Sequence, residues 1–237
     1  MPHNRYYIDT PLHENKSIVL TGEEWHHLAR VTRSRKEDNV ELINGHGVLA
    51  EATVSDLRKS EAELMVDKVT KKPSPPPLIL AQAIPRMNHL EWIVEKGTEL
   101  NATAFWLFPG NLSEKDTLSS NQLARLKHLC ISAMKQCGRL DLPKIVLMPP
   151  LAQWESVEGT LLFCDTTEDA PPLWNLPLTK TLPSPVCLFV GPEKGFDSKE
   201  THLLSHTLKA RGVRLHPNIL RAETAPLVAL SLIQKFL

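Results

Sequence analysis

The sequence predicts two domains of different class, a small β domain followed by a larger α/β domain with a parallel sheet. Three observations lead to this prediction. A proline-rich stretch divides the chain, a hairpin signal precedes it, and apolar runs of strand length alternate with helical spacing after it. With 237 residues, 42% of them hydrophobic, the chain can bury the cores of one small and one medium-sized domain.

The dividing stretch, residues 71–77, reads Lys-Lys-Pro-Ser-Pro-Pro-Pro. Proline has no N–H for a strand ladder, and it disfavours helix in the residue before it. The stretch is therefore expected to be a stiff, extended connector. We expect domains over residues 1–72 and 73–237.

The first domain shows the pattern of paired short strands. The strand-like run 40–43 leads to Asn44-Gly45, the run 48–54 follows, and 62–66 continues the set. Asn-Gly between two such runs is the strongest short-range signal for a hairpin. Short strands with closely spaced turns suggest a small β-barrel.

The second domain alternates strands and helices. Apolar runs of strand length stand at 78–84, 104–108, 145–148, 160–164 and 186–190. Apolar residues at helical spacing fill 90–100 and 123–137, and Gly138 stands where a helix C-terminal glycine belongs. Because the strand runs are continuously apolar rather than alternating, they predict a parallel sheet that is covered on both faces.

Composition excludes several classes of protein. The formal net charge is zero, so any nucleic-acid surface must be local. No apolar run reaches the roughly 18–20 residues of a membrane helix, and the N-terminus lacks a signal-peptide core, so we expect a cytoplasmic protein without a membrane partner. The four cysteines form no metal or disulfide pattern, and no metal site is expected.

One local cluster of positive charge stands before the hairpin. Residues 25–36 contain Arg30, Arg33, Arg35 and Lys36 and no acidic residue. Such a run is often only a solvated helix face. We favour the interpretation that this cationic run contacts RNA phosphates.

Residues 188–200 form the first segment with a candidate role in ligand binding or catalysis. A buried strand ends in Gly191-Pro192, and Asp197 with Glu200 forms a capping-box pattern for a helix. Glycine at the carboxyl end of a parallel strand lets a ligand approach the backbone closely, although an ordinary strand-to-helix turn has the same pattern. The segment matches neither a phosphate loop nor a dinucleotide fingerprint.

Residues 213–227 form the second such segment. Thr224 is a natural N-cap, Pro226 suits a first helical turn, and the helix expected over 225–236 is apolar nearly all round. Arg221 and Glu223 stand at the mouth of that buried helix, where charged side chains need a partner or a functional role. A structural Arg–Glu pair is the alternative to a role in catalysis.

In their order and spacing, three stretches resemble the signatures of the SPOUT methyltransferases, and more narrowly of the RsmE family. They are Gln-Cys-Gly-Arg at 136–139, Gly-Pro-Glu-Lys-Gly at 191–195 and Ile-Leu-Arg-Ala-Glu-Thr-Ala at 219–225. Residues 86–100 are similar to the family's first helix, 113–115 to a short loop and 27–33 to its N-terminal signature. Lys194 stands where the family usually has glycine, Lys115 replaces a usual Arg, Lys135 a usual Glu, and Ala222 a usual Thr or Val.

The resemblance implies a PUA-like β-barrel followed by a SPOUT-type parallel sheet with a C-terminal trefoil knot. It also implies a homodimer that uses S-adenosylmethionine to methylate N3 of a uridine in 16S ribosomal RNA. Three loops of the knot are implied to hold the cofactor. Their contacts would come from Cys164, Val190, Gly191, Pro192, Glu193, Gly195, Phe196, Leu215, Ile219, Leu220, Thr224 and Ala225.

Methylation of N3 requires loss of a weakly acidic N–H and attack on a sulfonium methyl group, so no cysteine nucleophile is needed. Arg221 is the candidate to stabilise the uridine anion, and Glu223 to orient Arg221 or act as base. RNA contacts are expected from Arg30, Arg33, Arg35, Arg86, Lys115 and Arg139. Two alternatives remain open: ribose 2′-O methylation by another SPOUT enzyme, and a catalytically silent RNA-binding protein on the same scaffold.

Overall fold

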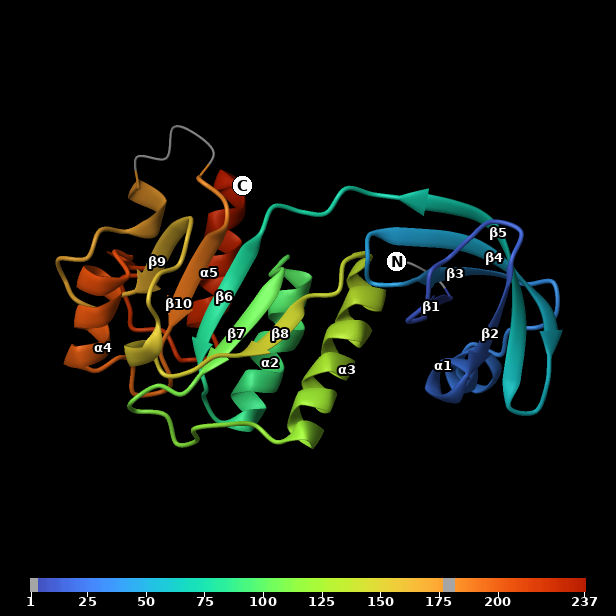
Figure 1. Ribbon diagram of the computed structural model, residues 1–237, viewed down its shortest axis with the longest axis horizontal. Helices are drawn as coiled ribbons and strands as arrows, with labels where there is room; N and C mark the ends of the chain where they lie inside the picture. Colours follow the sequence, from blue (N-terminus) through green and yellow to red (C-terminus); the bar gives the residue numbers. More distant parts are fainter. Residues whose placement is uncertain (1–3, 177–181) are drawn as a thin grey trace. The chain divides into compact units, whose positions relative to one another are not determined.

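The computed structural model describes residues 4–176 and 182–237, which form two compact units, each with a sheet of its own (Figure 1). The first unit comprises Met1–Ser74 together with Ile131–Leu142, and the second comprises Pro75–Cys130 and Pro143–Leu237. The expected first domain, residues 1–72, lies within the first unit, which also takes in the later segment.

The sheet of the first unit has five strands in the order β1-β3-β4-β5-β2. They are β1 (Arg5–Tyr7), β2 (Ser17–Thr21), β3 (Asn39–Ile43), β4 (Val48–Leu57) and β5 (Glu61–Lys71). All pairs are antiparallel except β1 with β3, and the sheet forms a half-barrel. The predicted hairpin joins β3 to β4, with Gly45 at a φ of +76° and Asn44 Oδ1 accepting a hydrogen bond of 2.9 Å from the His46 amide.

A short helical segment covers the core of this sheet. It consists of α1 (Gly22–His26) and a π-helical turn, η1 (His27–Val31). Leu28 is fully buried against Tyr6 and the inward-facing side chains of the strands. A smaller apolar cluster joins Ile43 to Met134 and Leu140, so that residues 131–142 complete the core of this unit.

The second unit contains a six-stranded sheet in which all neighbouring strands are parallel, as predicted. The order β11-β9-β10-β6-β7-β8 joins β6 (Leu78–Ala83), β7 (Ala104–Phe108), β8 (Lys144–Leu147), β9 (Thr160–Cys164), β10 (Val186–Val190) and β11 (Arg211–Val213). Every residue of β6 and β10 is buried, which is why these runs lack the alternation of a half-exposed strand.

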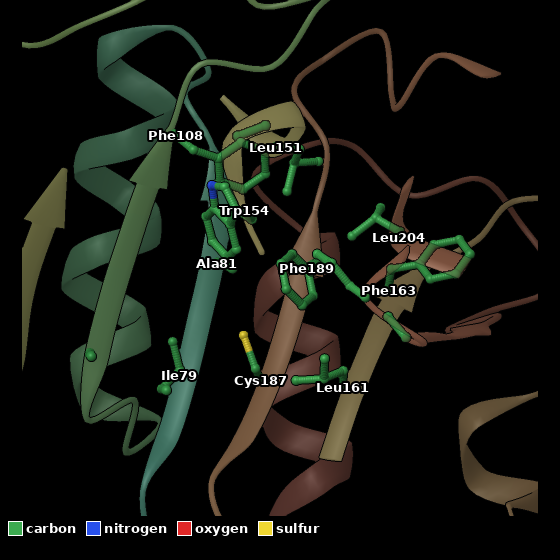
Figure 2. Packing of buried hydrophobic residues seen from close by; sticks show 14 residues of the cluster. Ile79, Ala81, Phe108, Leu151, Trp154, Leu161, Phe163, Cys187, Phe189 and Leu204 are labelled. Atoms are coloured by element: carbon green, nitrogen blue, oxygen red, sulfur yellow. The ribbon is translucent and has the colours of Figure 1, made fainter. Parts of the chain in front are cut away.

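Both faces of the central strands are covered. Helices α2 (Met87–Glu99) and α5 (Ala225–Ile233) lie behind the sheet in Figure 2. Gly97 allows this close packing, because a Cβ there would lie 2.7 Å from the Phe105 ring and 3.5 Å from Leu230. On the opposite face, Leu151 of η2 (Leu151–Gln153), Trp154 and Leu204 pack on Phe189 and its neighbours (Figure 2).

The remaining elements are α3 (Ser120–Cys137), α4 (Ser198–His202) with its π-helical turn η4 (Leu203–Thr207), and the 3-10 turns η3 (Leu173–Asn175) and η5 (Gln234–Phe236). Gly138, at a φ of +86°, ends α3 as predicted. No helix in the described ranges is long and apolar enough to cross a membrane. The trefoil knot stays a prediction.

Candidate active site

A cavity of about 260 Å³ lies at the carboxyl ends of β9 and β11. Its wall is built from Cys164, Asp165, Thr166, Glu168, Arg214, Leu215, His216, Pro217, Asn218, Ile219, Leu220 and Ala225. Five of the residues predicted to bind the cofactor are among them: Cys164, Leu215, Ile219, Leu220 and Ala225. The other seven lie outside this wall.

The wall suits a nucleoside ligand that carries both a positive and a negative charge. Leu215 and Leu220 offer apolar surface, while Asp165 and Glu168 carry carboxylates. Arg214 Nε is buried, and within the described part of the chain it has no hydrogen-bond partner, so a donor remains available. S-adenosylmethionine, with its adenine, hydroxyl groups and charged amino-acid part, fits this set of groups.

The Cys164 thiol at this wall is not a nucleophile. Burial, and secondarily the charge of Asp165, raises the pKa of Cys164 to about 12. The thiol is therefore protonated at neutral pH, where a reactive cysteine would be a thiolate. This agrees with a reaction that needs no covalent intermediate.

The turn from Gly191 to Phe196 connects β10 to α4. A Cβ on Gly191 would lie 2.9 Å from the carbonyl carbon of Gly195, so the turn closes on itself at a point where only glycine fits. The side-chain amide of the buried Gln82 donates a hydrogen bond of 3.0 Å to the Gly191 carbonyl. The left-handed φ of the turn, +73°, falls on Gly195 and not on Lys194, so lysine is accommodated without strain at that position.

Asp197 and Glu200 cap α4 as the sequence predicts. Asp197 accepts a hydrogen bond of 2.8 Å from the Glu200 amide, and the Glu200 carboxylate accepts one from the Asp197 amide. This capping box fixes the end of the Gly191–Phe196 turn, since it sets where the helix begins.

Glu193 of the same turn reaches the first turn of α2. Its Oε1 accepts hydrogen bonds from the Arg86 amide at 2.9 Å and from His89 Nδ1 at 2.8 Å. Glu223 Oε2 lies 3.9 Å from the same ring nitrogen, so one imidazole faces two carboxylates. The side chains of His89, Glu193 and Glu223 are only 23%, 27% and 22% exposed.

The ionisation of Glu193 reflects these contacts. Burial alone would raise the pKa of Glu193, but hydrogen bonds from the Arg86 amide, from its own amide and from His89 outweigh it. The net effect is a pKa below the usual range of a glutamate. Glu193 therefore carries its negative charge beside His89 at neutral pH.

Arg221 and Glu223 do not form the structural pair considered from the sequence. Glu223 faces His89, and the described residues include no ion-pair partner for the exposed Arg221 guanidinium. The amides of Thr224 and Ala225 each donate a hydrogen bond of 2.9 Å to the Arg221 carbonyl. This tight turn holds Arg221 at the start of α5, directly after the pocket residue Leu220. Thr224 occupies the N-cap position but makes no side-chain capping bond.

Four of the residues predicted to bind RNA belong to the first unit. Arg30, Arg33 and Arg35 are exposed, and the structure shows no ion pair for any of them among the residues it describes. Arg30 lies over the Trp25 ring, 5.9 Å from its centroid. Arg139 differs, because its Nε donates a hydrogen bond of 2.6 Å to the Asp141 carbonyl.

The other two belong to the second unit. Arg86 forms an ion pair of 2.6 Å with Glu114, which neutralises much of its charge. Lys115 is exposed. Lys135, which replaces a glutamate usual in the family, belongs to the first unit, where its Nζ lies 2.7 Å from Glu24.

The sequence analysis missed His89 as well as the pocket residues Asp165, Glu168 and Arg214. His89 lies in the stretch similar to the family's first helix, but nothing in its local pattern distinguishes it from an ordinary helical residue. Its partner Glu193 is 104 positions away. Only the fold brings them together.

Comparison with known proteins gives consistent matches over both units. The model of an RNA methyltransferase domain matches residues 72–234, and that of an RNA methyltransferase PUA domain matches residues 20–66. Ribosomal RNA small subunit methyltransferase E of Synechocystis is 34% identical over 230 residues, covering 93% of this chain and 74% of the relative. The protein of the same name from Bacillus subtilis is 27% identical, over 97% of this chain and 95% of the relative.

Two solved structures resemble the whole chain. Ribosomal RNA small subunit methyltransferase E from Neisseria gonorrhoeae, bound to S-adenosylmethionine, is 28% identical with a TM-score of 0.84, covering 99% of this chain and 97% of that one. A methyltransferase from Legionella pneumophila with bound S-adenosylmethionine is 25% identical with a TM-score of 0.86, covering 98% and 96%.

Proposed function

The chain belongs to the ribosomal RNA small subunit methyltransferase E (RsmE) family of RNA methyltransferases, and from this premise we propose that it methylates N3 of a uridine in 16S ribosomal RNA. The methyl donor is S-adenosylmethionine, which is bound in related structures from two organisms. The observation that carries the choice of reaction is the exposed Arg221, which directly follows a pocket with the chemistry to hold this cofactor.

When bound, the cofactor supplies an electrophilic methyl group. Arg221 stabilises the negative charge that develops on the uridine base as its N3 proton passes to solvent water, because a guanidinium can donate two parallel hydrogen bonds to such an anion. The turn closed by the Thr224 and Ala225 amides holds Arg221 in place before the substrate arrives. Glu223 supports this segment through its contact with His89 rather than through Arg221.

The cofactor is held by segments that follow three strands. Residues around Cys164 and Leu215 form the pocket wall, and Arg214 offers its unused Nε donor to a polar group of the ligand. The Gly191–Phe196 turn completes the site, and the backbone at Gly195 is open to the ligand because no atom lies within 4 Å of the position that a Cβ would take. We assign the trefoil knot implied by the resemblance to these same segments.

RNA affinity comes mainly from the N-terminal domain, residues 1–72, and methyl transfer from residues 73–237. The PUA match over residues 20–66 and the exposed Arg30, Arg33 and Arg35 support the first assignment. Lys115 is the second domain's best candidate for a phosphate contact, since Arg86 is engaged by Glu114 and Arg139 by the Asp141 carbonyl.

We further propose that the working enzyme is a homodimer in the cytoplasm. Ile219 is 82% exposed beside the pocket, and Leu227 and Val228 of the strongly apolar α5 are only partly buried. Large apolar side chains that remain accessible to solvent are typical of a surface that another subunit covers. Sedimentation equilibrium should give twice the monomer mass, and a monomer at micromolar concentration would contradict the homodimer.

The function is tested by transfer of an isotopically labelled methyl group to unmethylated 16S ribosomal RNA, followed by nucleoside analysis. The label should appear in N3-methyluridine. Label in a 2′-O-methylated nucleoside would identify a ribose methyltransferase instead. RNA binding without any transfer would identify a catalytically silent protein.

A further inference from the structure

The imidazole of His89 lies between two segments of the proposed cofactor site. Nδ1 is 2.8 Å from Glu193 in the Gly191–Phe196 turn and 3.9 Å from Glu223, two residues before the pocket residue Ala225. Three parts of the chain that are far apart in sequence therefore meet at one titratable ring. None of the family-like motifs in the sequence assigns His89 a role.

The charged side chains nearest to His89 in the neighbouring segments are acidic. The two carboxylates of Glu193 and Glu223 face it, one from each neighbouring segment. At the N-cap of its helix, Arg86 directs its guanidinium to Glu114. The remaining cations of the two segments, Lys194 and Arg221, have no ion pair with either carboxylate in the part of the chain that the structure describes.

The protonation state of His89 decides how many of these contacts are attractive. A neutral imidazole with its proton on Nδ1 keeps the hydrogen bond to Glu193. It has no net charge to attract Glu223, so the two carboxylates then repel each other across it. The imidazolium attracts both carboxylates.

We propose that His89 is a positioning residue that, in its protonated form, clamps the Gly191–Phe196 turn to the Arg221–Ala225 segment and so keeps the cofactor site closed. The role rests on the proposed function, because it concerns binding of the same cofactor. It acts through Glu193 and Glu223 and requires no contact of His89 with the cofactor itself.

The test measures S-adenosylmethionine binding by calorimetry at about pH 5.5 and about pH 8.5, on either side of the range in which histidine changes charge. Four proteins are compared: the unmodified chain, His89→Gln, His89→Lys and the control His202→Gln, which changes an exposed histidine of α4. The amino group of the ligand also titrates, near pH 8. Comparing the proteins at the same pH cancels that effect.

At the lower pH the unmodified protein should bind about fivefold more tightly than His89→Gln, the size expected for loss of one partly shielded ion pair. At the higher pH this ratio should fall close to one. His89→Lys, which keeps its charge, should bind more tightly than the unmodified protein at the higher pH. His202→Gln should match the unmodified protein at both.

The clamp would be overturned if the ratio of cofactor affinities of the unmodified protein and His89→Gln were the same at both pH values. A merely structural histidine would give the same loss of affinity at each pH. If His89→Gln proves unfolded in thermal melts, the comparison with His89→Lys decides alone, and a lysine variant weaker at the higher pH overturns the clamp. If the unmodified protein binds no S-adenosylmethionine at both pH values, the cofactor assignment is overturned together with the clamp.

Discussion

Glu193 Oε1 lies 2.8 Å from His89 Nδ1, although 104 positions separate the two residues. The same oxygen accepts a hydrogen bond from the Arg86 amide at the N-terminus of α2. A carboxylate at that end of a helix is stabilised by the unpaired amides and by the helix dipole. The contact therefore fixes the turn after β10 to a rigid element of the second unit.

Arg221→Ala should lower kcat by about 10²–10³, the loss typical of removing one donor that stabilises a developing anion. Affinities for RNA and cofactor should change little, because the contact strengthens only as charge develops. Arg221→Lys should recover part of the rate, since a point charge does not reproduce a planar fork of donors. Single-turnover rates on the three proteins make the measurement.

Thermal melts of the same proteins provide the control for Arg221. The guanidinium has no ion-pair partner in the described structure, so Arg221→Ala should keep a near-normal melting temperature. A variant that is folded and turns over normally would rule out the catalytic role. A large drop in melting temperature would show that the side chain is structural instead.

Gly191→Ala should weaken S-adenosylmethionine binding by about tenfold or more, which corresponds to about 1.4 kcal/mol. The added Cβ would meet the backbone of Gly195 at 2.9 Å, and a backbone contact cannot be relieved by a side-chain rotation. Gly195→Ala should cost less, because nothing lies within 4 Å of its Cβ and only the left-handed φ is unfavourable. Calorimetry that finds Gly195→Ala the worse binder would contradict this account of the turn.

Asp197→Ala should lower the free energy of unfolding by about 1 kcal/mol at neutral pH, as expected for loss of an N-cap. The hydrogen bond from the Glu200 amide is the largest cause of the lowered pKa of Asp197. A lowered folded-state pKa gives stability that is present above the unfolded value of about 3.9 and is lost as pH falls through the folded value.

The difference between Asp197→Ala and the unmodified protein should therefore shrink below about pH 4, as urea unfolding at several pH values would show. Asp116→Ala is the matched control, since Asp116 is exposed and is not part of a helix cap. An equal loss of stability in the two variants would contradict the role of the capping box.

Replacing Arg30, Arg33 and Arg35 together with alanine should weaken RNA binding and flatten its dependence on salt. Each lost phosphate contact should reduce the slope by roughly one unit. Cofactor binding should persist, because these residues belong to the other unit. An unchanged slope in filter-binding titrations would show that the run is only a solvated face.

The sequence predicts the fold of the six-stranded sheet well because its central strands β6 and β10 are fully buried. β7 begins and ends at the predicted residues, and β6 and β10 differ by one residue or less. β1, β2 and β11 were not predicted. β11 has three residues, one of them glycine, and its pairing with β9 comes from the fold rather than from a local pattern.

The candidate site also contains features that local sequence predicts and contacts that it does not. Asp197 and Glu200 were found because helix capping is local and leaves a signature within a few residues. The Glu193–His89 contact and the turn of Glu223 away from Arg221 depend on segments more than 100 positions apart, so no local pattern records them.

The central claim is tested most directly by mass spectrometry of 16S ribosomal RNA from cells that lack this protein. N3-methyluridine should be absent from one position, return when the unmodified chain is supplied, and stay absent when Arg221→Ala is supplied at equal abundance. An unchanged level of N3-methyluridine in the deficient cells would contradict the claim. So would full restoration by the Arg221→Ala variant, because it would remove the residue on which the proposed chemistry depends.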